Sequence, residues 1–313
     1  MINTITLNPA IDRLLFIDRF ERNVTARVRE KAESLGGKGV HISVNLRLMG
    51  EPCRAFGILF GETGRQIENM LADIGVPAYF VRGADGPGRD SRTNHVIIEN
   101  DGSSTIIAEH GVDLSDAELD LVLESLKANT AEGDSLVFSG DVSNAGDPYV
   151  YNRFMEAFEA RNVRFFVDAS GPALSKALEA APFLIKPNRG ELEEATGIAI
   201  DSEGDAIRAI RSLDRFGIQN IALSLGIEGS IVRFGDDLVL RAVPPDVPVK
   251  NTTGCGDAFL AGLIAGFTRG WEAGQMLRYA TAVSSATAAS PLCVGYETGF
   301  ADALFEQVFI KKL

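Results

Sequence analysis

The sequence predicts an α/β protein in which helices cover both faces of a doubly wound, mostly parallel β-sheet. Short apolar runs alternate along the chain with longer segments of helical periodicity, as is typical of βαβ units. Hydrophobic residues make up 45% of the 313 residues, which is ample for a large core. Several glycine-rich and polar motifs follow predicted strands, and open α/β sheets bind ligands beyond the carboxyl ends of their strands.

The individual elements follow from the same patterns. Buried strands are predicted at 2–7, 135–140, 164–170, 183–188 and 220–226. Helices are predicted near 62–75, 115–127, 148–161, 172–180, 189–196 and 203–216. The last third of the chain is predicted to be mostly helical, at 256–269, 271–289 and 301–309.

Two segments break this alternation. Residues 12–34 and 90–109 contain short alternating strands, and the second holds a hairpin signal, "ENDGSS". We expect them to form a small accessory sheet outside the main core.

Composition excludes several classes of protein. The net charge of −13 argues against a nucleic-acid partner and requires a locally basic pocket for any anionic substrate. Cys53, Cys255 and Cys293 are scattered and odd in number, which favours reduced thiols in a cytoplasmic protein. The N-terminus does not have the pattern of a signal peptide, and no apolar run approaches about 18 residues, so we expect no membrane partner.

The stretch "NTTGCGDAF", residues 251–259, precedes an apolar segment with helical spacing. Gly254 and Gly256 let backbone amides approach a bound group, and a helix N-terminus is a ready anion site. Asp257 can be read simply as complementing the helix dipole. Beside an anion site, however, a carboxylate also suits a general base. The helix N-terminus would also favour a reactive thiolate at Cys255 if this residue is exposed.

Five other motifs each have an ordinary structural reading. "SLGGKGVHIS" around Lys38 and "KPNRGELEE" both suit a helix start, and "TLNPAID" suits a turn. "SRTNHVII" places Arg92 and Asn94 on one strand face, where an exposed arginine is common, and "SLGIEG" suits a hairpin turn. The sequence lacks a Walker A motif and a dinucleotide G-x-G-x-x-G after the first strand. His41, His95 and His110 lack metal-ligand spacing.

Together these motifs resemble those of the ribokinase-like (PfkB) carbohydrate kinases, in the same order and over nearly the whole chain. "GCGD" resembles the family signature G-A-G-D, with Cys255 in the alanine position. "TLNPAID", "GGKG" and "KPNRGELE" are most similar to the branch that contains 1-phosphofructokinase and tagatose-6-phosphate kinase, and "SRTNHV" leans toward the former.

The resemblance implies a single kinase domain over residues 1–313, with lid strands contributed by about 12–34 and 90–109. It also implies ATP and Mg²⁺ as cofactors, a sugar phosphate as substrate, and a homodimer formed through the lids. Transfer of a phosphoryl group from ATP to fructose 1-phosphate is the activity that it favours. The alternatives are a tagatose-6-phosphate kinase, a kinase for an unphosphorylated sugar or nucleoside, and an inactive nucleotide-binding regulatory protein.

The resemblance also implies roles for individual residues. Asp257 is the expected base, and the amides of Gly254, Cys255 and Gly256 form the anion hole. The sugar phosphate is expected to contact Asp12, Gly37, Lys38 and Arg92, with Arg27 as a weaker candidate. The nucleotide is expected to contact Lys186, Ser224, Gly226, Gly229 and Thr253. Asn188 and Glu191 are expected near Mg-bound phosphates through water, with no direct protein ligand to the metal.

Two residues depart from the family pattern. The branch usually has Asn where His41 stands, in the sugar pocket, and S-G-S-L-P where this chain reads "SGDVSNAG". We expect Asp141 and His41 to line the sugar site and to pair with one another, because a carboxylate favours the charged form of a nearby histidine. The ordinary alternative is that Asp141 caps the following turn.

Overall fold

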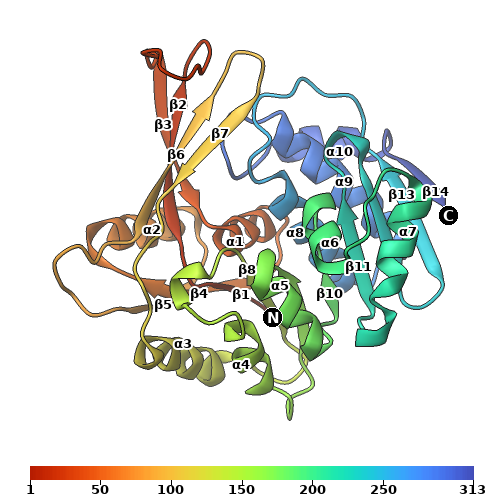
Figure 1. Cartoon of the computed structure of the whole chain (residues 1–313), viewed down its shortest axis with the longest axis horizontal. Helices are drawn as coiled ribbons and strands as arrows, with labels where there is room; N and C mark the ends of the chain where they lie inside the picture. Colours follow the sequence, from red (N-terminus) through yellow and green to blue (C-terminus); the bar gives the residue numbers. More distant parts are fainter.

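The chain folds around a ten-stranded sheet with a smaller, separate sheet projecting from it (Figure 1). The computed structural model describes all 313 residues. In spatial order the large sheet contains β14 (Phe309–Lys312), β13 (Leu238–Val243), β12 (Ser230–Phe234), β11 (Asn220–Ser224), β10 (Leu184–Ile185), β9 (Arg164–Asp168), β8 (Ser135–Ser139), β1 (Ile2–Thr6), β4 (Cys53–Leu59) and β5 (Ala78–Arg82).

The strands from β11 to β5 run parallel, and the three strands beyond β11 are antiparallel. The prediction of a doubly wound, mostly parallel sheet is therefore confirmed. Because the strands are parallel, their carboxyl ends lie along one edge of the sheet, where Ser139, Asp168 and Ser224 end β8, β9 and β11.

Helices cover both faces of this sheet. The alternation along β8 shows the two faces: Leu136 and Phe138 belong to one buried cluster and Val137 to the other. The first cluster packs against α3 (Asp116–Asn129), α4 (Val150–Glu156), α5 (Gly171–Ala177), α6 (Arg189–Thr196) and α7 (Glu203–Ser212). The second packs against α1 (Lys38–Leu48), α8 (Cys255–Arg269), α9 (Ala273–Ala288) and α10 (Thr298–Phe305).

Helices α8 and α9 approach one another closely because α8 has glycines at the contact. A Cβ at Gly262 would lie 2.6 Å from the Cα of Ala280, and one at Gly266 would lie 2.3 Å from Cγ of Met276. This contact fixes α8, and with it the position of the α8 N-terminus at the edge of the sheet.

The projecting sheet is the lid expected from the two irregular segments. Its strands, in spatial order, are β3 (Glu30–Gly36), β2 (Ala10–Phe16), β6 (Arg92–Ile98) and β7 (Ser104–Ala108). The hairpin predicted at "ENDGSS" joins β6 to β7. Helix α2 (Gly61–Ile74) packs beside the base of the lid, where Ile67 and Leu71 share a buried cluster with Ile11 and Leu35.

Several predicted boundaries are wrong. The helix expected at 301–309 ends at Phe305, because Phe309–Lys312 pairs with β13. The strand expected at 183–188 has only two ladder residues, since Pro187 offers no N–H to a neighbouring strand. Helices α4 and α7 are also shorter than predicted, and β4, β5, β13 and β14 were not predicted. No helix is both long enough and apolar enough to cross a membrane.

Candidate active site

The N-terminus of α8 has the geometry of an anion site. Gly254 caps the helix in the left-handed conformation, with φ of 81°, and a Cβ there would lie 1.9 Å from the carbonyl oxygen of Cys293. Only glycine fits such a position. The amides of Gly254, Gly256 and Asp257 donate to no acceptor in the protein, whereas that of Cys255 makes a long bond to Thr252. These free donors are available to a phosphate group.

Asp257 lies in the first turn of α8 and is buried. Its Oδ2 is 2.7 Å from Nδ1 of His41, which comes from the first turn of α1. Its Oδ1 accepts no hydrogen bond from the protein. The expected base therefore has one oxygen occupied and one available for a substrate proton. The contact with His41 was not predicted from the sequence, because residues 41 and 257 are brought together only by the packing of α1 on α8.

Cys255 does not have the reactive thiolate that the sequence predicts. Burial and the charge of Asp257 raise the pKa of this thiol to about 12. The carbonyl of Cys255 accepts a hydrogen bond from Ser284 at 3.0 Å.

Two lysines and a buried carboxylate lie beside the anion site. Asp168, at the end of β9, is 3.0 Å from Nζ of Lys38 and 3.2 Å from Nζ of Lys186. Burial raises the pKa of Asp168, but the two lysines outweigh it and the net shift is downward. A Cβ on Gly256 would lie 3.5 Å from Nζ of Lys186, so this ammonium adjoins the free amides of α8.

Lys38 faces this cluster and not Arg92. Its Nζ is also 3.9 Å from Glu191, and no carboxylate pairs with both Lys38 and Arg92. Burial lowers the pKa of Lys38, but the charges of Asp168, Asp257 and Glu191 raise it by more. The net shift of the pKa is upward, so this lysine stays charged. Asp168 was not predicted as a site residue, although its position at the end of a buried strand was a signal for one.

A second polar cluster lies where the lid joins the core. Nδ2 of Asn94 donates to Oδ1 of Asp12 at 2.8 Å, and Oδ2 of Asp12 is 3.7 Å from Nε2 of His41. Burial raises the pKa of Asp12, against the opposing effects of His41, Asn94 and Arg92. Gly36 gives this carboxylate room, since a Cβ there would lie 2.3 Å from its Oδ1. The adjoining Gly37 caps α1, with φ of 96°.

Arg92 is buried beside this cluster. It donates from Nε to the carbonyl of Asn8 and from Nη1 to that of Glu109. Its Nη1 is 3.5 Å from Oδ2 of Asp141, while Nη2 donates to no protein acceptor. Burial lowers the pKa of Arg92, and three neighbouring carboxylates oppose that effect. The guanidinium thus keeps free donors for an anion.

The expected pairing of Asp141 with His41 is wrong. The two side chains make no ion pair, because His41 faces Asp257 and Asp141 faces Arg92. Asp141 also accepts from the amide and the hydroxyl of Ser143, which is the turn-capping role given as the alternative.

The motif around residue 188 forms the capped start of α6. Oδ1 of Asn188 accepts from the amide of Glu191 at 2.9 Å, and Glu191 accepts from the amide of Asn188 at 2.8 Å. This is a capping box. The arrangement leaves Oε1 of Glu191 beside Lys38. No cluster of His, Cys, Asp and Glu side chains is arranged to hold a metal ion directly.

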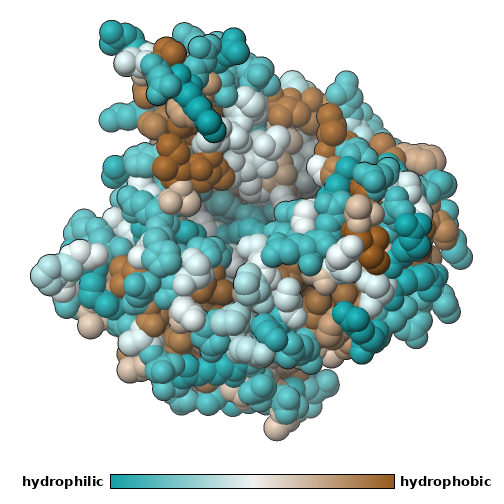
Figure 2. Space-filling model, in the orientation of Figure 1, coloured by the Kyte–Doolittle hydropathy of each residue, from teal (hydrophilic) through white to brown (hydrophobic).

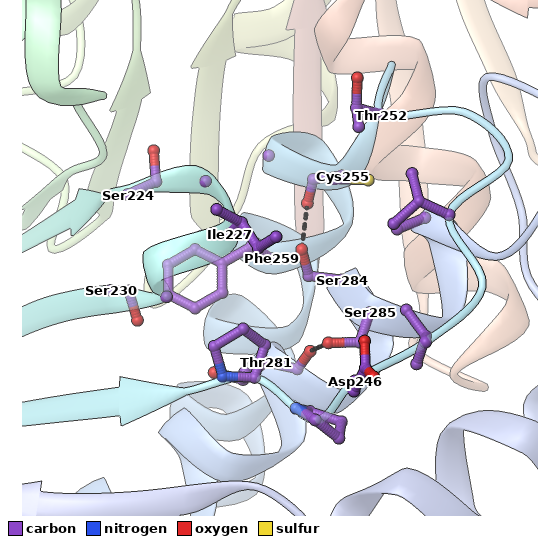
Figure 3. Close-up of a pocket in the computed structure, with 18 of the residues that line it drawn as sticks. Ser224, Ile227, Ser230, Asp246, Thr252, Cys255, Phe259, Thr281, Ser284 and Ser285 are labelled. Atoms are coloured by element: carbon purple, nitrogen blue, oxygen red, sulfur yellow. Dashed lines mark hydrogen bonds between the residues drawn. The ribbon is translucent and has the colours of Figure 1, made fainter. Parts of the chain in front are cut away.

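A cavity of about 650 Å³ lies next to the anion site, between the β11–β12 turn and α9 (Figure 3). Its lining includes Asn188, Ser224, Gly226, Ile227, Gly229, Ser230, Pro244, Pro245, Asp246, Val247, Val249, Thr252, Cys255, Gly256, Phe259, Thr281, Ser284, Ser285 and Ala288. This size suits a drug-sized or nucleotide ligand. The sequence did not predict that the serines and threonine of α9 and the 244–249 segment line this cavity. These residues do not belong to any motif that marks a ligand site.

Two expected site residues lie apart from these groups. Arg27 is exposed in the loop between β2 and β3 and makes no ion pair or hydrogen bond through its side chain. Thr253 does not line the cavity, although the neighbouring Thr252 does. Thr253 instead donates its amide to Asn251 at 2.9 Å.

Comparison with known proteins relates this chain to carbohydrate kinases. Its residues 5–296 match the pfkB family of carbohydrate kinases. It is 33% identical to a 1-phosphofructokinase of Borreliella burgdorferi over 288 residues, 92% of each chain. It is 31% identical to a 1-phosphofructokinase of Bacillus subtilis over 292 residues, 93% of each chain. Its fold is similar to that of phosphofructokinase-2 from Escherichia coli, with a TM-score of 0.89 at 23% identity and 98% of each chain covered.

The family match covers most of the chain, and the fold is the two-sheet α/β arrangement that its motifs predict. The chain therefore belongs to the pfkB family of carbohydrate kinases and has the ribokinase-like fold.

Proposed function

We propose that this sugar kinase transfers the γ-phosphoryl group of ATP to a hydroxyl of fructose 1-phosphate and so forms fructose 1,6-bisphosphate. The observation that carries the proposal is the position of Asp257, with one free carboxylate oxygen, in the same helical turn as free amides that can bind the transferred group. The names of the relatives at 33% and 31% identity support this choice of sugar phosphate.

The reaction requires positioning and charge stabilisation more than covalent chemistry. Asp257 accepts the proton of the sugar hydroxyl as that oxygen attacks the γ-phosphorus. The bond from this phosphorus to the β–γ bridging oxygen breaks, and its electron pair leaves with ADP. The amides at the start of α8 and the ammonium of Lys186 stabilise the charge that develops on the transferred group.

The remaining groups bind the two substrates. Asp12 binds sugar hydroxyls, and Arg92 binds the phosphate that the sugar already carries, through the donors that the protein leaves free. The nucleotide occupies the cavity beside α9, where Ile227 and Phe259 offer apolar contacts and Ser224 offers a hydroxyl. Lys38, which pairs with Asp168 and lies near Glu191, binds phosphate oxygens on the side of the transferred group.

Mg²⁺ fits the oxygen donors of this site. Glu191 and Asn188 would hold it through water, because Glu191 has a carboxylate oxygen free of the capping box. When bound, the ion neutralises phosphate charge.

Release of ADP with a panel of acceptors tests the proposal. The panel contains fructose 1-phosphate, fructose 6-phosphate, tagatose 6-phosphate, fructose and a nucleoside. We expect the highest kcat/KM for fructose 1-phosphate, with the bisphosphate identified by ³¹P NMR. Preference for an unphosphorylated acceptor would contradict the proposed binding of the sugar's phosphate by Arg92. Absence of turnover with every acceptor, while ATP still binds, would indicate a regulatory protein.

A further inference from the structure

His41 stands where both of its ring nitrogens face hydrogen-bond acceptors. Nδ1 is 2.7 Å from Oδ2 of Asp257, and Nε2 is 2.8 Å from the carbonyl oxygen of Leu35. The ring is buried, and Gly254 packs so closely that a Cβ there would lie 3.6 Å from Nδ1.

The protons of this pair can be counted from the geometry. A carbonyl oxygen only accepts, so Nε2 must carry a proton. A neutral ring protonated at Nε2 would then turn the lone pair of Nδ1 toward an ionised carboxylate 2.7 Å away, which is repulsive. A second proton must therefore lie between Nδ1 and Oδ2. Whether this proton resides on Nδ1 or on Oδ2, the hydrogen bond holds the carboxylate in one orientation.

The surrounding charges favour retention of this proton at neutral pH. Burial lowers the pKa of His41, but the hydrogen bond and charge of Asp257, the charge of Asp12 and the carbonyl of Leu35 outweigh burial and raise it to about 8. Asp257 on α8 and Asp12 on β2 are the charged groups that face the ring. Cys293, from the segment after α9, stays neutral because burial raises its thiol pKa to about 12.

We propose that His41 is a positioning residue for the base: it holds one proton against Oδ2 of Asp257, so that Oδ1 is presented to the sugar hydroxyl. This inference rests on the proposed function. In the transfer step the hydroxyl proton passes to Oδ1, the sugar oxygen bonds to the γ-phosphorus, and ADP leaves with the electron pair of the broken bond. The proton on the His41 side stays with the pair and is not consumed.

The pH dependence of kcat tests the role in catalysis. In the wild type, loss of the shared proton above about pH 8 releases the carboxylate, so we expect kcat to fall on the alkaline side. His41→Asn can still donate an amide N–H to Asp257 but does not titrate. We expect this variant to lose about tenfold or less in kcat at pH 7 and to show no alkaline fall up to pH 9.5. An alkaline limb that persists unchanged in His41→Asn would overturn the proposal.

Imidazole ¹⁵N resonances test the pair without any substrate. The chain has three histidines, so His41 is assigned by comparison with His41→Asn. We expect the His41 ring to titrate near pH 8 in the wild type. In Asp257→Asn the midpoint should move to lower pH by about 1 or more. An unchanged midpoint in Asp257→Asn would overturn the pairing. If no sugar phosphate is turned over, the proposed function fails, and this titration still decides whether the pair exists.

Discussion

At the scale of single residues, the proposed site divides into a half for phosphoryl transfer and a half for the sugar. Asp257, the α8 amides and Lys186 make up the first, and Asp12 and Arg92 belong to the second. The two halves meet at His41, which contacts Asp257 directly and approaches Asp12. Substitutions in each half are therefore expected to affect different kinetic constants.

Asp257→Asn removes the base while it keeps the size and position of the side chain. We expect kcat to fall by about 10²–10⁴-fold with the dissociation constant of ATP nearly unchanged, because the lining of the cavity proposed for the nucleotide does not include Asp257. Turnover and ATP titration calorimetry measure the two quantities. Asp302→Asn, on α10 and away from the α8 N-terminus, serves as the control and should keep full turnover. Retention of more than about a tenth of wild-type kcat in Asp257→Asn would contradict a role as base.

Arg92→Ala removes free donors from the proposed phosphate clamp. We expect the KM for the sugar phosphate to rise tenfold or more, since a charge-assisted hydrogen bond is worth about 1.5–3 kcal/mol. The KM for ATP should change little. Arg65→Ala, which breaks only an exposed ion pair on α2, is the matched control. Equal increases in both KM values would place Arg92 in a structural role.

Asp141→Ser separates the turn-capping contact of Asp141 with Ser143 from its contact with Arg92. A serine hydroxyl can still cap the turn at Ser143, but it no longer neutralises Arg92. We therefore expect a lower KM for the sugar phosphate and an unchanged KM for ATP. Steady-state kinetics with both substrates varied measure this difference. A rise in the KM for the sugar phosphate would show instead that Asp141 binds the substrate.

At the scale of elements, the start of α8 depends on one backbone conformation. The helix is anchored by its contact with α9, and the chain enters it through Gly254, whose left-handed conformation turns free amides toward the site. The anion site is thus a property of how the helix begins and of what holds the helix in place.

Gly254→Ala should damage both folding and catalysis. The left-handed conformation and the contact with the carbonyl of Cys293 oppose a Cβ there. We expect a loss of more than about 1 kcal/mol in the free energy of unfolding. Gly274→Ala, in α9, is the control: nothing lies within 4 Å of its Cβ, and it should gain up to about 0.5–1 kcal/mol. Urea unfolding of both variants measures these differences. Equal stability of the two would contradict the requirement for glycine at 254.

At the scale of the whole molecule, the lid stands over a hollow in the main body (Figure 2). Its edge strand β7 pairs only with β6, and Ile106 and Ile107 on it are exposed although they point to opposite faces. An unpaired edge with exposed apolar side chains is a surface suited to burial against another chain. This agrees with the homodimer expected through the lid, which remains a prediction.

Ile107→Lys should weaken that dimer. A charge at the centre of an apolar contact opposes its burial. We expect the wild type to elute as a dimer in size-exclusion chromatography with light scattering, and Ile107→Lys to elute as a monomer. Leu121→Lys, at an exposed position on α3, controls for surface charge alone and should stay dimeric. A wild type that is monomeric at all concentrations would contradict the predicted dimer.

The sequence by itself determined the elements whose signals are local. Alternation and helical periodicity predict β1, β8, β9, β11 and most helices, because each pattern spans neighbouring residues. The helix starts at Gly254 and at Asn188 also follow from local spacing. Alternation in residues 12–34 and 90–109 also predicts the accessory sheet, and the family motifs identify that sheet as a lid.

Tertiary structure decided which distant residues meet. The contact between His41 and Asp257 joins positions 216 residues apart, and the cluster of Asp168 with Lys38 and Lys186 joins three separate segments of the chain. Pairing of β14 with β13 likewise overrode a helical pattern near the C-terminus. Such contacts depend on how whole helices and strands pack, so no spacing within one segment encodes them. The sequence shows that a carboxylate, Asp257, follows the two glycines, and only the packing of α1 against α8 places a histidine on one of its oxygens.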